Sequence, residues 1–129
     1  LALQHASPQT RLVLAEPAGA DDTARSLAAG QRMTDFTPDT FCDGLRTLIG
    51  APNFQLLQAA GAEVIVVDDD ATRAAMRLLW EVLKQVVEPS SAIVLAAVLA
   101  QPARFAGQRV GLVLSGGNVD LPALRWEVA

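Results

Sequence analysis

The sequence predicts an α/β fold in which helices flank part of a parallel, doubly wound sheet. Two observations support this prediction. Short apolar segments typical of strands alternate along the chain with segments that have helical periodicity and helix-capping residues. Every link between successive strand segments is also long enough for the crossover that parallel strands require. No repeat, linker or low-complexity stretch interrupts the 129 residues, so we expect residues 1–129 to form a single unit.

The first half of the chain predicts two strands and three helices. The expected segments are a helix over residues 1–4, a strand over 11–15, a helix over 21–29, one or two helical turns within 44–50, a helix over 53–60 and a strand over 63–67. An aspartate at position 21 or 22 is suited to cap the second helix, and Gly30 to end it. Residues 31–43 show no clear period and predict a loop. The first helix has no capping residue before Leu1, so we expect the natural chain to extend further upstream.

The second half predicts two helices and a third strand. The expected segments are a helix over residues 71–87, a helix that begins at Pro89 and a strand over 108–114. Aspartates at 68–70 place a cap and negative charge before the long helix. Its apolar stripe consists of Ala75, Leu78, Leu79, Val82, Leu83 and Val86. Arg77 and Glu81, on the opposite face, are one turn apart and able to pair.

Composition and charge narrow the classes of partner. Hydrophobic residues make up 51% of the chain and charged residues 19%; the mean hydropathy is +0.30, which is apolar for so small a domain. We therefore expect another subunit, or a further part of the same fold, to cover some of its surface. A net charge of −4 argues against a nucleic-acid partner. The longest apolar run, residues 92–100, is too short to cross a bilayer, and the single cysteine favours a reducing, cytoplasmic location.

The most informative stretch is residues 112–120, where an apolar strand segment leads directly into a serine, two glycines and an asparagine. Such residues at the carboxyl end of a parallel strand are typical of a ligand site. They also tolerate turn geometry, so a tight turn that leaves the strand is the structural alternative. Residues 88–92, Glu-Pro-Ser-Ser-Ala, likewise suit a plain helix start, with Glu88 at the positive end of the helix dipole.

Residues 16–22 place carboxylates and main-chain carbonyls in one loop between a strand and a helix. Two carboxylates and a carbonyl form a hard oxygen site suited to Mg²⁺, Ca²⁺ or Mn²⁺. The structural alternative is that Asp21 and Asp22 only cap the helix. In residues 41–45, Phe-Cys-Asp-Gly-Leu, the simplest account of Cys42 is a small buried thiol.

Together these segments resemble the family of serine racemases and serine/threonine dehydratases (threonine ammonia-lyases), fold-type II enzymes that use pyridoxal 5′-phosphate. The resemblance implies that the Ser115 hydroxyl bonds to the pyridine nitrogen of the cofactor and that Gly116 keeps side chains clear of the ring. A neutral hydroxyl does little to favour a protonated ring nitrogen. The resemblance also places Gly44 and Glu88 beside the cofactor. It places Asn118 at the edge of the site, where some relatives bind a nucleotide effector.

Two further implications come from the same family. Its divalent-cation-dependent members carry Glu-Pro-x-x-Ala-Asp-Asp, which residues 16–22 match in full. The ion would be held by Glu16, the main-chain carbonyl of Ala20 and Asp22, in a structural or activating role. The chain departs from the family at Ser91, which stands where glycine is common and narrows the space there.

Essential parts of that chemistry are not found in these 129 residues. Such enzymes need a lysine that binds the cofactor covalently and a glycine-rich loop that holds its phosphate. The sole lysine, Lys84, is expected on the solvent-facing side of the long helix. In the family the lysine, the glycine run and the second acid/base serine of racemases all lie upstream. The resemblance therefore covers nearly all of this chain but only the carboxyl-terminal part of the family's large domain, with no catalytic residue in it.

The expected function is that of a part. The complete enzyme would deprotonate a small hydroxyamino acid at Cα and then eliminate water from Cβ or return the proton, and we expect this chain to be inactive alone. Its expected partners are the amino-terminal part of the same enzyme or a complementary chain, further copies of itself, and the amino-acid substrate. The alternative is a non-catalytic α/β module that binds a divalent cation and pairs with a partner chain.

Overall fold

The computed structural model describes residues 2–124. Its helices and strands are, in chain order, α1 (Ala2–Ala6), β1 (Val13–Pro17), α2 (Asp22–Ala29), α3 (Ala51–Ala59), β2 (Glu63–Val67), α4 (Asp69–Leu78), α5 (Pro89–Ala100) and α6 (Pro102–Phe105). Shorter turns add 3-10 geometry at Ala18–Ala20, Asp43–Leu45 and Leu121–Ala123, and π-helical geometry at Leu79–Leu83. Leu1 of the predicted first helix lies outside the described residues.

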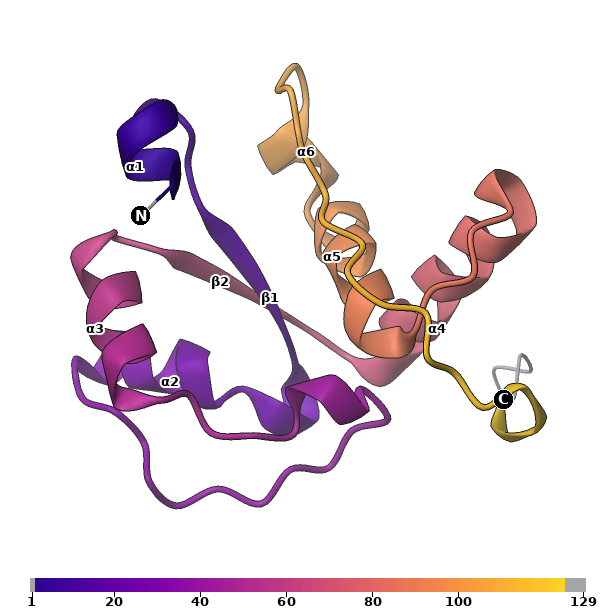
Figure 1. The fold of residues 1–129 in the computed structure, drawn as a ribbon, viewed down its shortest axis with the longest axis horizontal. Coiled ribbons are helices and arrows are strands. Elements are labelled where there is room, and N and C mark those ends of the chain that lie inside the picture. Colours follow the sequence, from indigo (N-terminus) through magenta and orange to yellow (C-terminus); the bar gives the residue numbers. More distant parts are fainter. Residues whose placement is uncertain (1, 125–129) are drawn as a thin grey trace.

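The two strands pair in parallel, with Val13 opposite Glu63 and Pro17 opposite Val67. The stretch that holds α2 and α3 supplies the crossover that parallel pairing requires. Figure 1 shows α2 and α3 on one side of the strands and α4 and α5 on the other. The predicted α/β class, with parallel strands and flanking helices, is therefore confirmed.

The main core lies where α5 packs against the two strands and against α4. Its buried members are Cys42, Ile65, Val67, Ala75, Ile93, Ala96 and Ala97. The alanines of α5 allow the neighbouring backbones to approach closely. Burial of these side chains joins the two strands to α5, whose amino end thereby takes a defined place beside the sheet.

Several local signals act as the sequence predicts. Gly30 ends α2 with a left-handed φ of 66°, which glycine adopts at little cost. The Asp68 side chain caps α4 by accepting a hydrogen bond from the Ala71 N–H at 2.6 Å. The Arg77 and Glu81 side chains form the predicted ion pair, 2.7 Å apart.

The predicted long helix over 71–87 is wrong at its carboxyl end. Regular α-helix stops at Leu78, a π-helical turn follows, and Lys84 adopts a left-handed φ of 57°. The chain has to turn before Pro89, because α5 packs against α4. The Trp80 indole N–H holds this turn by donating to the Val87 carbonyl at 3.1 Å. Packing of α5 thus overrides the local helical pattern.

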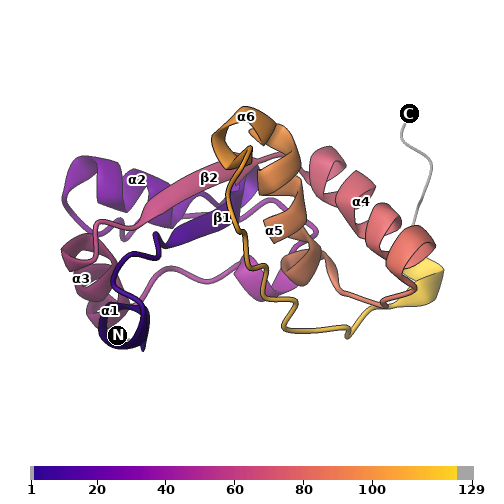
Figure 2. The same ribbon diagram turned by 90° about the horizontal axis from the view of Figure 1, so that it is seen from above.

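The predicted third strand over 108–114 is also wrong. These residues have irregular structure, and Val113 is 77% exposed. Among residues 2–124, the only strands are β1 and β2, which pair with each other. The segment instead leads from α6 back toward the amino end of α5 (Figures 1 and 2). An apolar pattern does not supply the hydrogen-bonding neighbour that a strand needs.

Smaller differences concern boundaries. The first strand lies two residues later than the predicted 11–15, and the helix predicted over 53–60 begins at Ala51. The turns predicted within 44–50 reduce to the 3-10 turn at Asp43–Leu45. No helix in the described part of the chain is long and apolar enough to cross a membrane.

Candidate functional site

Three segments that are distant in sequence meet at the amino end of α5. They are the 3-10 turn with Gly44, the first turn of α5 and the residues around Gly116. The Gly44 N–H donates to the Ser90 Oγ at 2.9 Å, and the Gly116 N–H donates to the Ser91 Oγ at 3.4 Å. Neighbouring serines of α5 therefore hold the two glycines that the family resemblance places at the cofactor.

Glu88 makes the tightest connection to the segment after Ser115. Its backbone N–H donates to the Gly116 carbonyl at 3.1 Å, and its Oε2 accepts from the Asn118 N–H at 3.0 Å. Glu88 lies at the N-cap position of α5. The structure thus brings together four predicted site residues, Gly44, Glu88, Gly116 and Asn118, and the exposed Ser115 lies between them in sequence.

The glycines at this site are required by close approach. A Cβ on Gly116 would lie 2.5–2.6 Å from the carboxyl atoms of Glu88, and one on Gly44 would lie 3.0 Å from the Ser90 Oγ. A Cβ on Gly117 would lie 2.7 Å from the Val86 carbonyl oxygen. The Glu88 carboxyl, the Ser90 hydroxyl and the Val86 carbonyl already fill these spaces, so the glycines let the segments pack closely against one another.

These residues fit one side of a pyridoxal phosphate site. A flat aromatic ring would need to lie close to the backbone, and Gly44, Gly116 and Gly117 have no side chains of their own to obstruct it. Its ring nitrogen would need one hydrogen-bonding group, and the exposed Ser115 hydroxyl is a group of that kind. The groups that would bind the phosphate and the reactive carbon are not among the described residues of this wall.

Sequence reasoning did not identify the residues that position this wall. The hydroxyls of Ser90 and Ser91 have that role, and so does Asp69, which was expected only to supply charge at the start of a helix. Asp69 accepts hydrogen bonds from the Thr40 hydroxyl at 2.5 Å and from the Phe41 N–H at 2.9 Å. It therefore connects the loop before Gly44 to α4, a contact that the local sequence does not predict.

The predicted cation loop follows β1. Both Glu16 oxygens accept backbone N–H groups at the start of α2, from Thr23 at 3.1 Å and from Ala24 at 2.8 Å. Glu16 therefore caps α2, the role that the sequence assigns to Asp21 or Asp22, whereas the Asp21 side chain pairs with Arg25 at 2.8 Å. A carboxylate from the preceding strand thus satisfies the free N–H groups of this helix end.

Asp22 is 2% exposed, and its Oδ2 accepts the Ile49 N–H at 2.8 Å. Burial raises the pKa of Glu16 above its ordinary 4.5, and the nearby Asp22 carboxylate adds to the rise, whereas the bonds from Thr23 and Ala24 oppose it. Both carboxylates border an open cavity of about 570 Å³. Among residues 2–124, no three His, Cys, Asp or Glu side chains gather as metal ligands. The cation ligands predicted from the sequence include only two such side chains, Glu16 and Asp22, and their third member is the main-chain carbonyl of Ala20.

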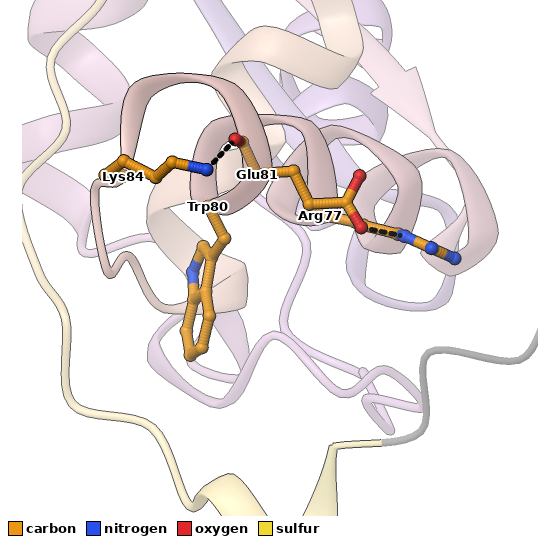
Figure 3. Close-up of a pocket in the computed structure, with 4 residues that line it drawn as sticks. All are labelled: Arg77, Trp80, Glu81 and Lys84. Carbon is orange, nitrogen blue, oxygen red and sulfur yellow. Dashed lines mark hydrogen bonds and ion pairs between the residues drawn. The ribbon is translucent and has the colours of Figure 1, made fainter.

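Lys84 lies apart from these sites, on the outer surface of the turn after α4. Figure 3 shows it beside a surface hollow of about 350 Å³ that it lines with Arg77, Trp80 and Glu81. Its Nζ donates to the Glu81 carbonyl at 2.5 Å, and the residue is exposed. Its exposure agrees with the surface position that the sequence predicts.

Cys42 is fully buried in the core, as the sequence predicts. Burial raises the pKa of its thiol from 9.0 to about 11, partly opposed by a hydrogen bond from Thr40. A protonated, enclosed thiol has little nucleophilic character at neutral pH. Cys42 therefore serves packing in this fold.

Comparisons with known proteins show the family of this chain. The family described as "Pyridoxal-phosphate dependent enzyme" matches residues 1–116. The chain is 41% identical over 127 residues to the beta-hydroxyaspartate dehydratase of Paracoccus denitrificans (strain Pd 1222), covering 98% of this chain and 40% of that protein. It is 43% identical over 122 residues to the serine racemase of Dictyostelium discoideum, covering 92% and 38%.

Solved structures give the same result. The structure of maize serine racemase matches with a TM-score of 0.88 and 44% identity, over 94% of this chain and 39% of that one. The crystal structure of the T.th. threonine deaminase matches with a TM-score of 0.86 and 43% identity, over 93% and 44%. This chain thus spans about two fifths of the length of the relatives that it matches. It belongs to the family of pyridoxal-phosphate-dependent enzymes, and within that family it is similar to serine racemases and hydroxyamino-acid dehydratases.

Proposed function

We propose that this chain is the carboxyl-terminal part of the large domain of an enzyme that removes the Cα proton of a hydroxyamino acid. The complete enzyme then eliminates water from Cβ or returns the proton. The observation that supports this most directly is the meeting of Gly44, Glu88 and Gly116 at one end of α5. We propose a cytoplasmic location, which the single, buried Cys42 supports.

Pyridoxal phosphate, when bound, supplies an electron sink that acidifies the Cα proton of an attached amino acid. The residues of this chain would bind and orient its ring. The Ser115 hydroxyl would share a hydrogen bond with the ring nitrogen without adding the negative charge that favours its protonation. Gly44 and Gly116 would let the ring approach the backbone, and Glu88 would hold the segment after Ser115 in place. Asn118, bonded to Glu88, would lie at the edge of the site, where a nucleotide effector could contact it.

The relatives support the substrate class. Their names refer to serine, threonine and beta-hydroxyaspartate. All three amino acids carry a hydroxyl on Cβ, the group that leaves as water in a dehydration. We therefore propose a small amino acid with a β-hydroxyl as the substrate of the complete enzyme.

The test of this function compares the chain alone with the complete protein. The purified chain should show no turnover of L-serine or L-threonine, because the lysine and the phosphate loop are supplied elsewhere. The protein completed with the amino-terminal part of such an enzyme, fused or added in trans, should bind pyridoxal phosphate and release either 2-oxo acid and ammonia or the D-amino acid. Turnover by the chain alone contradicts the proposed division of the site. A completed protein that binds a divalent cation but no pyridoxal phosphate supports the non-catalytic module instead.

We also propose that the missing part covers the apolar residues left exposed here. They cluster at the end of α4 and on the segment that leads to Ser115: Leu78, Val82, Leu83, Val86, Val110, Leu112, Val113 and Leu114. Exposed apolar surface of this extent is unusual in a stable monomer. Mixing the chain with the amino-terminal part should give a complex in size-exclusion chromatography and higher thermal stability, whereas failure to associate would count against the proposal. Self-association of the complete enzyme is a separate expectation that the same experiment measures.

The loop after β1 is proposed as a divalent-cation site. Glu16, the Ala20 carbonyl and Asp22 offer hard oxygen donors, and the Asp22 carboxylate beside Glu16 contributes to its raised pKa, a repulsion that a cation would offset. Titration of the complete protein with MgCl₂, CaCl₂ or MnCl₂ should raise its melting temperature, with NaCl of equal ionic strength as the control. The Glu16→Gln and Asp22→Asn variants should lose this rise. An equal rise in both variants would place the ion elsewhere.

A further inference from the structure

Ser91, which stands where the family commonly has glycine, has a contact that glycine could not make. The residue is 1% exposed, and its Oγ accepts the Gly116 N–H at 3.4 Å. A buried hydroxyl is costly unless it is hydrogen-bonded, and no buried side-chain nitrogen or oxygen in the described part of the chain lacks a partner. The substitution therefore adds a polar connection between α5 and the segment after Ser115.

The position of this connection matters because it acts on the peptide unit next to Ser115. The Gly116 N–H belongs to the same planar unit as the Ser115 carbonyl, so its hydrogen bond restrains the ψ angle of Ser115. On the other side of Gly116, the carbonyl accepts the Glu88 N–H at 3.1 Å. Two successive peptide units are thus held by a single turn of α5, and the Asn118 N–H adds a third bond, to the Glu88 carboxylate.

The adjacent Ser90 acts on the other glycine segment of the wall, where its Oγ accepts the Gly44 N–H at 2.9 Å. The two serines are consecutive in a helix, so the spacing of their hydroxyls changes little. Gly44 and Gly116 are therefore both bonded to the same rigid turn of α5. Without the Ser91 hydroxyl, the Gly116 side would lose one of its bonds, while the Gly44 side would keep its bond to Ser90.

We propose that Ser91 is a positioning residue, whose hydroxyl orients the peptide after Ser115 so that the Ser115 hydroxyl meets the cofactor ring nitrogen in one fixed geometry. The inference rests on the proposed role of Ser115 toward pyridoxal phosphate. Ser91 itself touches neither the ring nor the substrate. Its effect passes through the Gly116 N–H to the orientation of Ser115. The visible absorbance of the bound cofactor is therefore the relevant measurement, because it depends on the hydrogen bond at the ring nitrogen.

The experiment uses the complete enzyme with Ser91→Ala, Ser91→Gly and Ser91→Thr. The first two variants remove the hydroxyl and the third retains it. We expect loss of the hydroxyl to weaken pyridoxal phosphate binding about threefold to tenfold, as for loss of one hydrogen bond. It should also shift the visible absorbance band of the bound cofactor and lower kcat with KM changed less than about twofold. Ser91→Thr should restore the spectrum and the affinity.

The matched control is Thr72→Val, which removes another fully buried hydroxyl, one that donates to the Asp68 carbonyl at 3.0 Å on α4. It should lower the melting temperature and leave the spectrum and the cofactor Kd unchanged. If Ser91→Ala behaves like Thr72→Val, Ser91 has only a structural role and the inference is overturned.

A second measurement needs no variant. Hydrogen exchange of the wild-type enzyme should show the Gly116 amide protected, and exchange at the rate of an open chain would overturn the inference even if the Ser91 variants fail to fold. The proposed function fails differently: the wild-type complete enzyme would then bind no pyridoxal phosphate at all. If wild type binds the cofactor and the Ser91 variants match it, only the positioning role of Ser91 is rejected.

Discussion

Replacing Gly116 by alanine tests whether the backbone wall beside Glu88 is as closely packed as the structure shows. The new Cβ would lie 2.5–2.6 Å from three atoms of the Glu88 carboxyl group, the nearest atoms to it. Contacts this short are not tolerated, so the carboxyl group must rotate away. In doing so it loses the 3.0 Å hydrogen bond from the Asn118 N–H.

The magnitude follows from two opposing effects. A hydrogen bond to a charged acceptor contributes about 1.5–3 kcal/mol, and the exposure of Asn118 favours the lower end. The backbone of Gly116 does not have a positive φ, so alanine there restricts the unfolded chain and stabilises by about 0.4–1 kcal/mol. We therefore expect Gly116→Ala to lower the free energy of unfolding by about 0.5–1 kcal/mol.

A double-mutant cycle tests directly whether Glu88 causes the destabilisation. In a Glu88→Ala background the obstructing atoms and the hydrogen bond are both absent, so Gly116→Ala should become neutral or stabilise by up to about 1 kcal/mol. Urea unfolding followed by tryptophan fluorescence measures both values, with Gly111→Ala as the control because a Cβ there meets nothing within 4 Å. Equal destabilisation by Gly116→Ala in the two backgrounds would refute the close contact with Glu88.

Three further predictions concern the rest of the fold. Gly19→Ala should cost at least about 2 kcal/mol in urea unfolding, because its Cβ would overlap the Asp39 carbonyl oxygen; a near-neutral effect would contradict that backbone contact. Ile93→Ala, at a core position 1% exposed, should cost about 2–5 kcal/mol, and Leu99→Ala, at one 52% exposed, less than about 1 kcal/mol; similar costs would place the core elsewhere. Because burial raises the Cys42 thiol pKa from 9.0 to about 11, the folded state retains this proton longer than the unfolded state. The resulting stability is complete below pH 9 and falls by up to about 2–3 kcal/mol as pH rises through 11. Unfolding curves at pH values of about 8, 9 and 10 measure this fall, and Cys42→Ala should remove it. If the free energy of unfolding of Cys42→Ala falls with pH as steeply as that of the wild type, other groups cause the fall.

Signals that act within a few residues were predictable. The bounds of β2 follow from its run of β-branched residues, the end of α2 from Gly30 and the cap of α4 from Asp68. Signals that depend on distant partners were not. The residues after Leu78 have helical periodicity, yet the chain leaves the helix because α5 must pack against α4. Residues 108–114 have the composition of a strand but no strand neighbour in the described part of the chain.

The candidate site divides in the same way. The sequence by itself determined which residues are proposed to contact the cofactor, because Ser115, Gly116, Gly44 and Glu88 lie in short motifs whose residue types can be recognised without knowledge of the fold. Only the tertiary structure decided that these motifs form one wall, and that Glu88, Ser90 and Ser91 hold it together. The physical reason is that these segments lie tens of residues apart in the sequence. Their hydrogen bonds and close contacts arise from the packing of α5 against the sheet, which cannot be predicted from any single short motif.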